Sequence, residues 1–110
     1  MNFEELKTKV EEWANDKDLL HSENAEKQFL KFIEEVFEFK SEMDLIHILG
    51  GNELNSHDMT LEMGDIFVTL IILCNQLGID PVECLEMAYK KISKRRGKTI
   101  DGVFIKEEDL

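Results

Sequence analysis

Five acidic residues at two places in the chain have a spacing that could let their carboxylates bind a metal ion together. Glu34, Glu35 and Glu38 occur within one five-residue segment, and Glu62 and Asp65 lie three residues apart. On an α-helix, residues three or four apart share a face, so each group presents its carboxylates together. If the two helices pack antiparallel, the carboxylates face one another and repel strongly unless a cation lies among them. Oxygen ligands without Cys or His favour Mg²⁺ or Mn²⁺.

The second group belongs to an unusually apolar segment, Leu61 to Leu77. At ~100° per residue, its apolar side chains cover most of the helix circumference and leave a narrow polar strip that includes Glu62 and Asp65. A helix of this kind is expected at the centre of a fold. Because carboxylates buried without a partner are costly, we expect a buried Asp65 to be protonated, to pair with a cation or to bind a metal ion.

Helical periodicity predicts four helices that position these residues. They cover residues 3 to 16, about 23 to 46, about 57 to 77, and 81 to about 96. Gly50 to Ser56 is expected to be a loop, Gly78 to close the third helix, and Asp80-Pro81 to begin the fourth. The predicted fold class is therefore all-α, a four-helix bundle in a single domain over residues 1–110. Residues 97–110 are expected to form a short extended tail or flap.

The charge balance argues against a broad face for nucleic acid, because the formal net charge is -11. Six of the 13 positive residues nevertheless lie between Lys90 and Lys98, with no acid among them. Such a concentration suggests either a locally held small anion or a basic end that suits the helix dipole. Within it, Lys91, Lys94 and Arg95 are candidates to hold phosphate.

Two further polar groups have two interpretations each. Lys31 lies one turn before Glu34 and Glu35, so it either contacts phosphate or forms an ion pair with Glu35. Asn75 and Gln76 either reach a nucleobase or satisfy buried polar groups.

Cys74 and Cys84 lie on apolar faces of predicted helices, which predicts reduced core thiols in an intracellular protein. The N-terminus begins with a charged amphipathic stretch and lacks the pattern of a secretory signal. The longest apolar run, Ile66 to Cys74, is far shorter than the ~20 residues that span a bilayer. We therefore expect a soluble cytoplasmic protein that does not associate with a membrane.

The two acidic segments resemble the EExxE and ExxD motifs of the MazG-like, all-α nucleotide pyrophosphohydrolases. Glu34-Glu35-Val36-Phe37-Glu38 matches the first motif and Glu62-Met63-Gly64-Asp65 the second, and the order and the gap between them also fit. Phe29 to Ile33 and Leu77 to Asp80 resemble the segments that usually accompany the motifs. The resemblance covers roughly residues 25 to 106.

This resemblance implies Mg²⁺-dependent hydrolysis of a nucleoside triphosphate between its α and β phosphates. The products would be the monophosphate and pyrophosphate, formed by direct attack of water, and Mn²⁺ is an alternative metal. By position in the motifs, the metal ligands would be Glu35, Glu38, Glu62 and Asp65. Glu34 would be a further acidic residue of the catalytic site that orients water or a ligand.

A homo-oligomer, either a dimer or a tetramer, is also expected, as in the family. Four helices from 110 residues leave much apolar surface on the Phe-rich helix and around Trp13. Two alternatives to the main interpretation stay open. One is a related reaction, hydrolysis of phosphoribosyl-ATP, and the other is a non-catalytic acidic helical module that binds a protein partner. In the second alternative, Asp65 pairs with a lysine and the protein does not respond to metal.

Overall fold

The computed structural model describes residues 1–48 and 56–110, without the side chains of Ser56 and His57. Apart from Ser56, the loop predicted from Gly50 to Ser56 lies outside the described residues. The chain is mostly helical (74%), with four α-helices and a small two-stranded sheet at the C-terminus among these residues. The predicted predominance of helix is confirmed at this level of detail.

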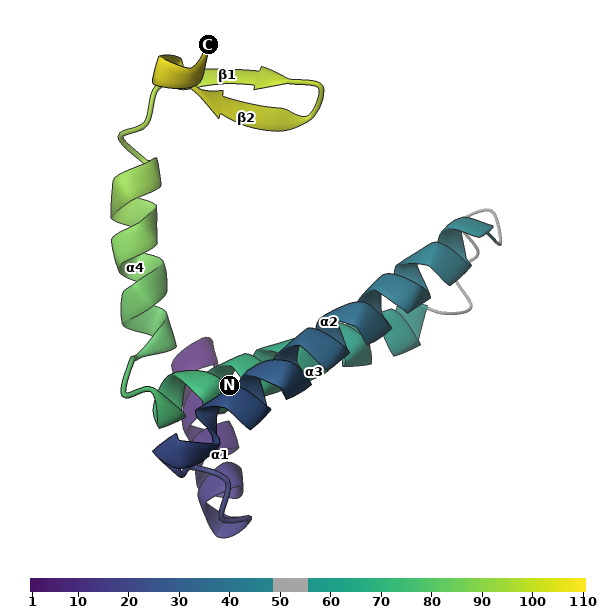
Figure 1. Cartoon of the computed structure of the whole chain (residues 1–110), viewed down its shortest axis with the longest axis vertical. Helices are drawn as coiled ribbons and strands as arrows, with labels where there is room; N and C mark the ends of the chain where they lie inside the picture. The colour runs from purple at the N-terminus through teal and green to yellow at the C-terminus, as the bar shows by residue number, and fades with distance from the viewer. Residues whose placement is uncertain (49–55) are drawn as a thin grey trace. The chain divides into compact units, whose positions relative to one another are not determined.

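The helices begin and end close to the predicted positions, except at the end of the last one. Their bounds are α1 Phe3–Asp16, α2 Ala25–Ile48, α3 Ser56–Gln76 and α4 Pro81–Ile92. In Figure 1, α2 lies alongside α3, and α1 also contacts α3. The chain divides into two compact units, Met1–Ile79 and Asp80–Leu110, which are described separately below. The single domain over residues 1–110 stays a prediction.

The core of the first unit lies along the C-terminal half of α3. Ile71, Ile72 and Leu73 are buried there, as is Ala14 of α1. The N-terminal half of α3 is more open, although Phe67 makes an edge-on ring contact with Phe3, with 6.2 Å between centroids. The apolar character of α3 thus predicts its central position correctly, but burial is confined to one half of the helix.

The end of α3 is fixed by backbone hydrogen bonds. The Ile79 N–H donates to the Cys74 carbonyl at 2.9 Å, and the Gly78 N–H donates to the Asn75 carbonyl at 3.1 Å. Gly78 has a φ of 72°, in the left-handed region that glycine adopts without strain. This pair of bonds is a Schellman motif, which confirms the prediction that Gly78 closes the helix.

The second unit begins with α4, whose start agrees with the sequence. The Asp80 side chain accepts a hydrogen bond from the Val82 N–H at 3.0 Å, and Pro81 occupies the first helical position. A side-chain acceptor satisfies one of the free N–H groups of the first turn, and proline has none to satisfy. The predicted cap is therefore confirmed.

The predicted end of α4 is wrong, because the helix ends at Ile92 and does not reach Arg96. Continuing the helix would place Lys94 one turn from Lys90, and like charges at this spacing are unfavourable. The Ser93 N–H still donates to the Tyr89 carbonyl at 2.9 Å. The N–H groups of Lys94 and Arg95 donate three residues back, to the carbonyls of Lys91 and Ile92, so the chain leaves the helix through a tighter turn.

After α4 the chain forms a β-hairpin, with β1 (Gly97–Ile100) antiparallel to β2 (Val103–Lys106). Asp101 and Gly102 connect the strands, with φ values of 51° and 79°. Positive φ at both central residues is typical of the tight turns that suit the twist of a hairpin. The sequence predicts a short extended tail or flap over residues 97–110, but it does not predict that this tail forms two paired strands.

The two cysteines differ in exposure, and neither is in a disulfide. Cys74 is buried in the core of the first unit, as expected. Cys84 is exposed on α4, so the expectation of a core thiol is wrong there. None of residues 80–110 is buried, which means that the apolar face of α4 has no core within its own unit.

A search of the described helices for membrane spans finds no single helix of sufficient length and apolar content. The consecutive helices α3 and α4 meet that criterion only jointly, on length and composition.

Candidate functional site

The contact between α2 and α3 brings together three of the four predicted metal ligands. Glu35 of α2 and Glu62 and Asp65 of α3 each offer a carboxylate oxygen, and these three oxygens all lie within 4.8 Å of one another. The helices run antiparallel, since Gln28 near the start of α2 donates to the Thr69 carbonyl, closer to the end of α3. The predicted convergence of the two acidic segments is therefore what the structure shows.

Glu35 is the most enclosed member of this carboxylate cluster, with 7% of its surface exposed. Its Oε1 lies 3.2 Å from the Lys31 Nζ, while its Oε2 is buried without a hydrogen-bond partner among the described residues. The hydrogen bond to Glu35, followed by the charge of Glu34, raises the pKa of Lys31 above its usual value. Lys31 therefore forms the ion pair that was one of its two interpretations, and phosphate contact stays a prediction.

Glu62 carries the clearest sign of crowded negative charge. Desolvation raises its pKa, and the charges of Glu35, Asp65 and Glu42 raise it further. Its Oε2 is buried and has no hydrogen-bond partner among the described residues. A half-buried carboxylate that resists ionisation beside other carboxylates is a group that a cation would stabilise.

Glu38, the fourth predicted ligand, is exposed and lies beside the cluster. A hydrogen bond with Glu35, together with the charge of Glu35, raises the pKa of Glu38. Glu34 is exposed as well, and its Oε1 lies 3.7 Å from the Lys31 Nζ. Neither side chain belongs to the group of oxygens within 4.8 Å, so their predicted roles rest on the motif.

The expected burial of Asp65 is wrong, because its side chain is exposed. Exposure instead increases across the cluster, from buried Glu35 through half-buried Glu62 to exposed Asp65. Periodicity identifies α3 as central, but it does not say how far its neighbours extend along it. The consequence is a site that opens to solvent on the Asp65 side.

One acidic residue of this region is absent from the predicted site. The Oε2 of Glu42 is buried without a hydrogen-bond partner among the described residues, and its charge contributes to the raised pKa of Glu62. The signal was present in the sequence, because Glu42 follows Glu35 by seven residues, which is two helical turns along the same face. The family motif ends at Glu38, so the motif by itself does not include Glu42.

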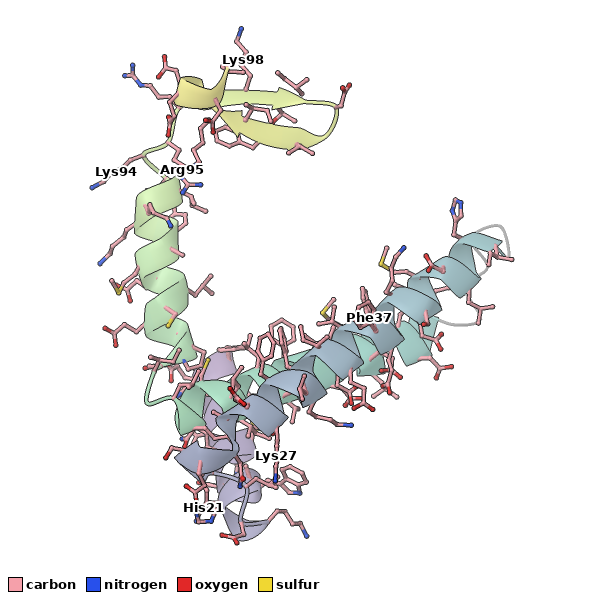
Figure 2. All side chains as sticks on the ribbon, in the orientation of Figure 1. His21, Lys27, Phe37, Lys94, Arg95 and Lys98 are labelled. Atoms are coloured by element: carbon pink, nitrogen blue, oxygen red, sulfur yellow. The ribbon has the colours of Figure 1, made fainter. Side chains whose placement is uncertain are left out.

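The predicted phosphate ligands Lys91, Lys94 and Arg95 belong to the second unit. Their side chains are exposed, and Figure 2 labels Lys94 and Arg95 beyond the end of α4. Contact with a phosphate chain stays a prediction for all three.

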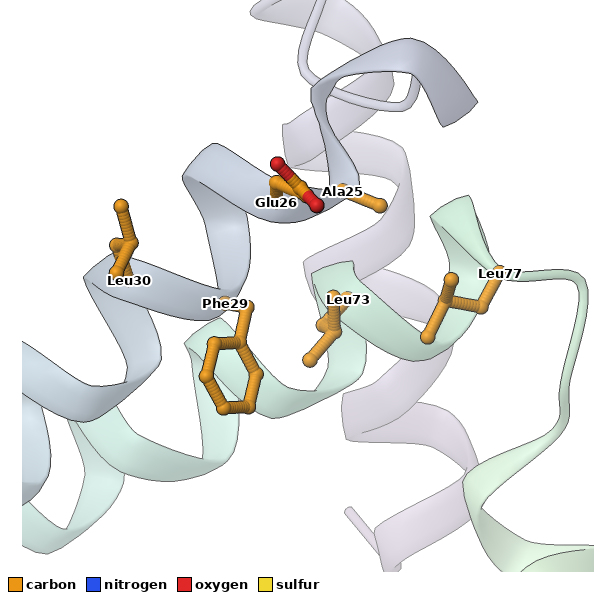
Figure 3. A pocket seen from close by; sticks show the side chains of 6 residues that line it. All are labelled: Ala25, Glu26, Phe29, Leu30, Leu73 and Leu77. Carbon is orange, nitrogen blue, oxygen red and sulfur yellow. The ribbon is translucent and has the colours of Figure 1, made fainter.

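A pocket of about 500 Å³ lies between the start of α2 and the end of α3. Figure 3 shows Phe29 and Leu30 from α2 together with Leu73 from α3 and Leu77 directly after it, and Ala25 and Glu26 complete the lining. Its walls are almost entirely apolar, and Glu26 is the one ionisable residue that lines it. Such a surface suits an apolar partner better than chemistry on a phosphate.

Comparison with known proteins identifies no function. No family model matches the chain, and no solved structure matches it. The chain is similar to an uncharacterized 18.2 kDa protein in the rep-hol intergenic region of Haemophilus phage HP1, strain HP1c1. The two sequences are 32% identical over 82 residues, which are 74% of this chain and 45% of the phage protein. The chain therefore spans less than half the length of this relative.

Proposed function

We propose that this protein is a Mg²⁺-dependent nucleoside triphosphate pyrophosphohydrolase of the MazG-like type, which cleaves between the α and β phosphates. The observation that carries the proposal is the convergence of Glu35, Glu62 and Asp65, whose ligand oxygens lie within 4.8 Å of one another. All three residues belong to the two motifs that resemble the family, one on each helix, and the resemblance supplies the reaction.

The donor set fits a hard divalent cation. All the ligand atoms are carboxylate oxygens, and the buried Oε2 atoms of Glu35 and Glu62 have no hydrogen-bond partner among the described residues. Buried polar atoms are normally paired, so two such atoms beside a third carboxylate mark a place for positive charge. We propose Mg²⁺ because it binds through a few carboxylates and leaves coordination positions for water and phosphate. Mn²⁺ meets the same requirement.

The side chains around the cluster supply the remaining functions. A bound divalent ion would neutralise phosphate charge and lower the pKa of an attacking water. We propose Glu38, which lies beside Glu35 and has a raised pKa, as the carboxylate that accepts a proton from that water or as a further ligand of the ion. Lys31 offers a cation at the same edge, and Lys91, Lys94 and Arg95 are proposed to hold the triphosphate.

The same proposal includes a finer description of the fold, a four-helix bundle that assembles as a dimer or tetramer. Packing of α1 and α2 against α3 supports the bundle. Exposed apolar side chains on α2 support the assembly, because a second copy would remove them from water.

The test is pyrophosphate release from canonical, deoxy and modified nucleoside triphosphates with Mg²⁺ or Mn²⁺. Asp65→Asn and Glu38→Gln should each lower the rate by more than about 100-fold while the protein stays folded. Glu12→Gln is the matched control, because Glu12 is an exposed carboxylate on α1 outside the cluster, and its rate should be unchanged. Absence of hydrolysis across the panel would contradict the proposal. Metal binding without hydrolysis would then favour phosphoribosyl-ATP as substrate, and absence of both would favour the interaction module.

A further inference from the structure

The connection between α1 and α2 carries a histidine placed between two carboxylates. Figure 2 labels His21, which directly precedes a short 3₁₀-helix, η1 (Ser22–Asn24), that leads into α2. The His21 Nε2 lies 2.5 Å from the Asp18 Oδ1, and the His21 Nδ1 lies 3.9 Å from the Glu23 Oε1. Each ring nitrogen therefore faces a different carboxylate, one before η1 and one within it.

Only the protonated ring suits both neighbours. Neutral imidazole carries one N–H, so one of its two nitrogens turns a lone pair toward a carboxylate, whereas imidazolium donates from both nitrogens. The hydrogen bond to Asp18 raises the pKa of His21 above its usual value of 6.5, and the charges of Asp18 and Glu23 raise it further. His21 therefore changes charge in a pH range where few other side chains do.

These two carboxylates are the only charged groups that act on the ring among the described residues. The nearby pairs Asp16-Lys17 and Glu26-Lys27 each combine opposite charges. α3 also packs against η1, and its second half, Phe67–Gln76, contains no Asp, Glu, Lys, Arg or His, while its one thiol is buried. The proton on the ring is therefore controlled from the connection itself.

Asp18 is also the residue at which the end of α1 turns. Its φ is 60°, a left-handed conformation in which most residues other than glycine are strained. The Asp18 N–H donates to the Asn15 carbonyl at 3.0 Å, and the Leu19 N–H donates to the Ala14 carbonyl at 2.9 Å. These bonds close α1 by a Schellman motif in which aspartate occupies the position that is usually glycine. The contact with His21 holds the side chain of this residue.

The same turn is tied to the end of α3. The Leu19 carbonyl accepts a hydrogen bond from the Gln76 Nε2 at 2.8 Å, and Gln76 is 6% exposed. This bond agrees with the interpretation of Gln76 as a residue that satisfies buried polar groups. Leu19 thus closes α1 through its N–H and binds α3 through its carbonyl, and Asp18 directly precedes it. A change at the contact between His21 and Asp18 therefore reaches the end of α3 through one residue.

We propose that His21, Asp18 and Glu23 form a pH-sensitive clasp on the connection between α1 and α2. The imidazolium joins the two carboxylates, and loss of its proton opens the clasp and leaves the turn at Asp18 less firmly held. Because the pKa of His21 is raised, the folded chain binds this proton more tightly than the unfolded chain. The stabilisation is thus complete below pH 6.5 and is lost as the pH rises through the raised pKa.

The effect is expected to be local, because the side chains of all three residues are exposed to solvent. The experiment follows the metal-free full chain by NMR from about pH 5.5 to about pH 9. The ring signals of His21 should titrate with a midpoint above 6.5, and the side-chain amide signals of Gln76 should move with the same midpoint. Exchange of the Leu19 N–H, corrected for the intrinsic effect of pH, should become about two- to fivefold faster across that midpoint.

Variants of the two carboxylates identify the partners of the ring. Asp18→Asn should lower the midpoint of His21 toward 6.5, because asparagine has no charge yet still adopts the left-handed conformation. Glu23→Gln should lower it less, since Glu23 is the more distant partner. Glu26→Gln is the matched control, because Glu26 is an exposed carboxylate on the first turn of α2 that does not act on His21. Its midpoint should equal that of the wild type.

A wild-type midpoint of 6.5 or lower, or one that Asp18→Asn leaves unchanged, would overturn the inference. So would a titration of the ring that neither the Gln76 amide nor the exchange of Leu19 follows. His21→Gln should abolish the pH response of both reporters, and a response that persists in this variant would also overturn the inference. None of these measurements involves catalysis, so their outcome is independent of the proposed reaction.

Discussion

Glu62 and Glu38 show how a carboxylate cluster affects stability when no cation is bound. The pKa of each is raised above its ordinary value of 4.5, by desolvation for Glu62 and by the contact with Glu35 for Glu38. A raised pKa means that the folded protein holds these protons more tightly than the unfolded chain. The metal-free protein should therefore lose stability as the pH rises from 4.5 through the raised pKa values.

Glu62→Gln is expected to separate stability from metal binding. In EDTA at neutral pH the variant should melt at a higher temperature than the wild type, because one of several crowded negative charges is removed. In Mg²⁺ a hundredfold above its Kd the wild type should gain about 2.7 kcal/mol, and the variant should gain much less. Thermal melts followed by circular dichroism measure both effects. A variant that is less stable than the wild type in EDTA, yet still stabilised by Mg²⁺, would show that Glu62 is structural.

For single residues, the sequence predicts which carboxylates belong to the cluster better than it predicts how exposed each of them is. The spacing within each helix predicts which carboxylates share a face, because helix geometry is regular, and antiparallel packing of α2 and α3 then brings Glu35 together with Glu62 and Asp65. The exposure of Asp65 and the inclusion of Glu42 depend on how far α2 covers α3. How far α2 covers α3 depends on packing between the two helices, and the apolar pattern of a single helix does not reveal it.

At the scale of the helices, two glycines in or beside α3 have opposite roles. Gly78 adopts a φ of 72°, where a side chain is strained, whereas Gly64 lies within the helix and a Cβ added there would meet no atom within 4 Å. A glycine inside a helix can allow a neighbouring helix to approach closely. Among the described residues of this chain, no helix approaches Gly64 in that way.

Alanine at each glycine gives a matched pair of predictions. Gly78→Ala should lower the free energy of unfolding by about 1–2 kcal/mol, because alanine is strained in the left-handed conformation. Gly64→Ala should raise it by about 0.5–1 kcal/mol, because alanine favours helix. Urea denaturation of the metal-free protein measures both. Destabilisation by Gly64→Ala would indicate that a second copy packs closely against that position.

Helix ends show where prediction succeeds at this scale. Asp80, Pro81 and Gly78 are residues with specific terminal roles, and the structure places them as predicted. The early end of α4 has no such marker before Gly97. Repulsion between like charges one turn apart in the basic segment disfavours further helix, but it is a small effect beside helix propensity.

For the whole molecule, negative charge and exposed apolar surface are both concentrated on the first unit. Acidic and basic residues are equal in number between residues 80 and 110, so the net charge of -11 resides on the first unit. The same unit exposes large apolar side chains along α2, among them Phe29, Leu30 and Phe37. Figure 2 labels Phe37, whose surface is 66% exposed. Apolar surface of this extent usually marks an interface.

We therefore predict that the protein is an oligomer and that Phe37→Glu weakens its association by at least about tenfold. The reason is that burying a phenylalanine contributes about 1.5–3 kcal/mol, and a charge in its place would be desolvated. Sedimentation velocity over a range of concentrations measures the effect. Lys40→Gln is the control, since Lys40 lies on the same helix and pairs with Asp44 at 2.6 Å on the exposed surface. A monomeric wild type would contradict the prediction.

The contrast between the two thiols has a practical consequence. Cys84 is open to solvent on α4, while Cys74 is enclosed by the core of the first unit. An alkylating reagent therefore meets one accessible sulfur in the folded protein and gains the other only when that core opens. A dye attached at position 84 reports on the second unit, and the rate of modification at position 74 reports how often the first unit unfolds.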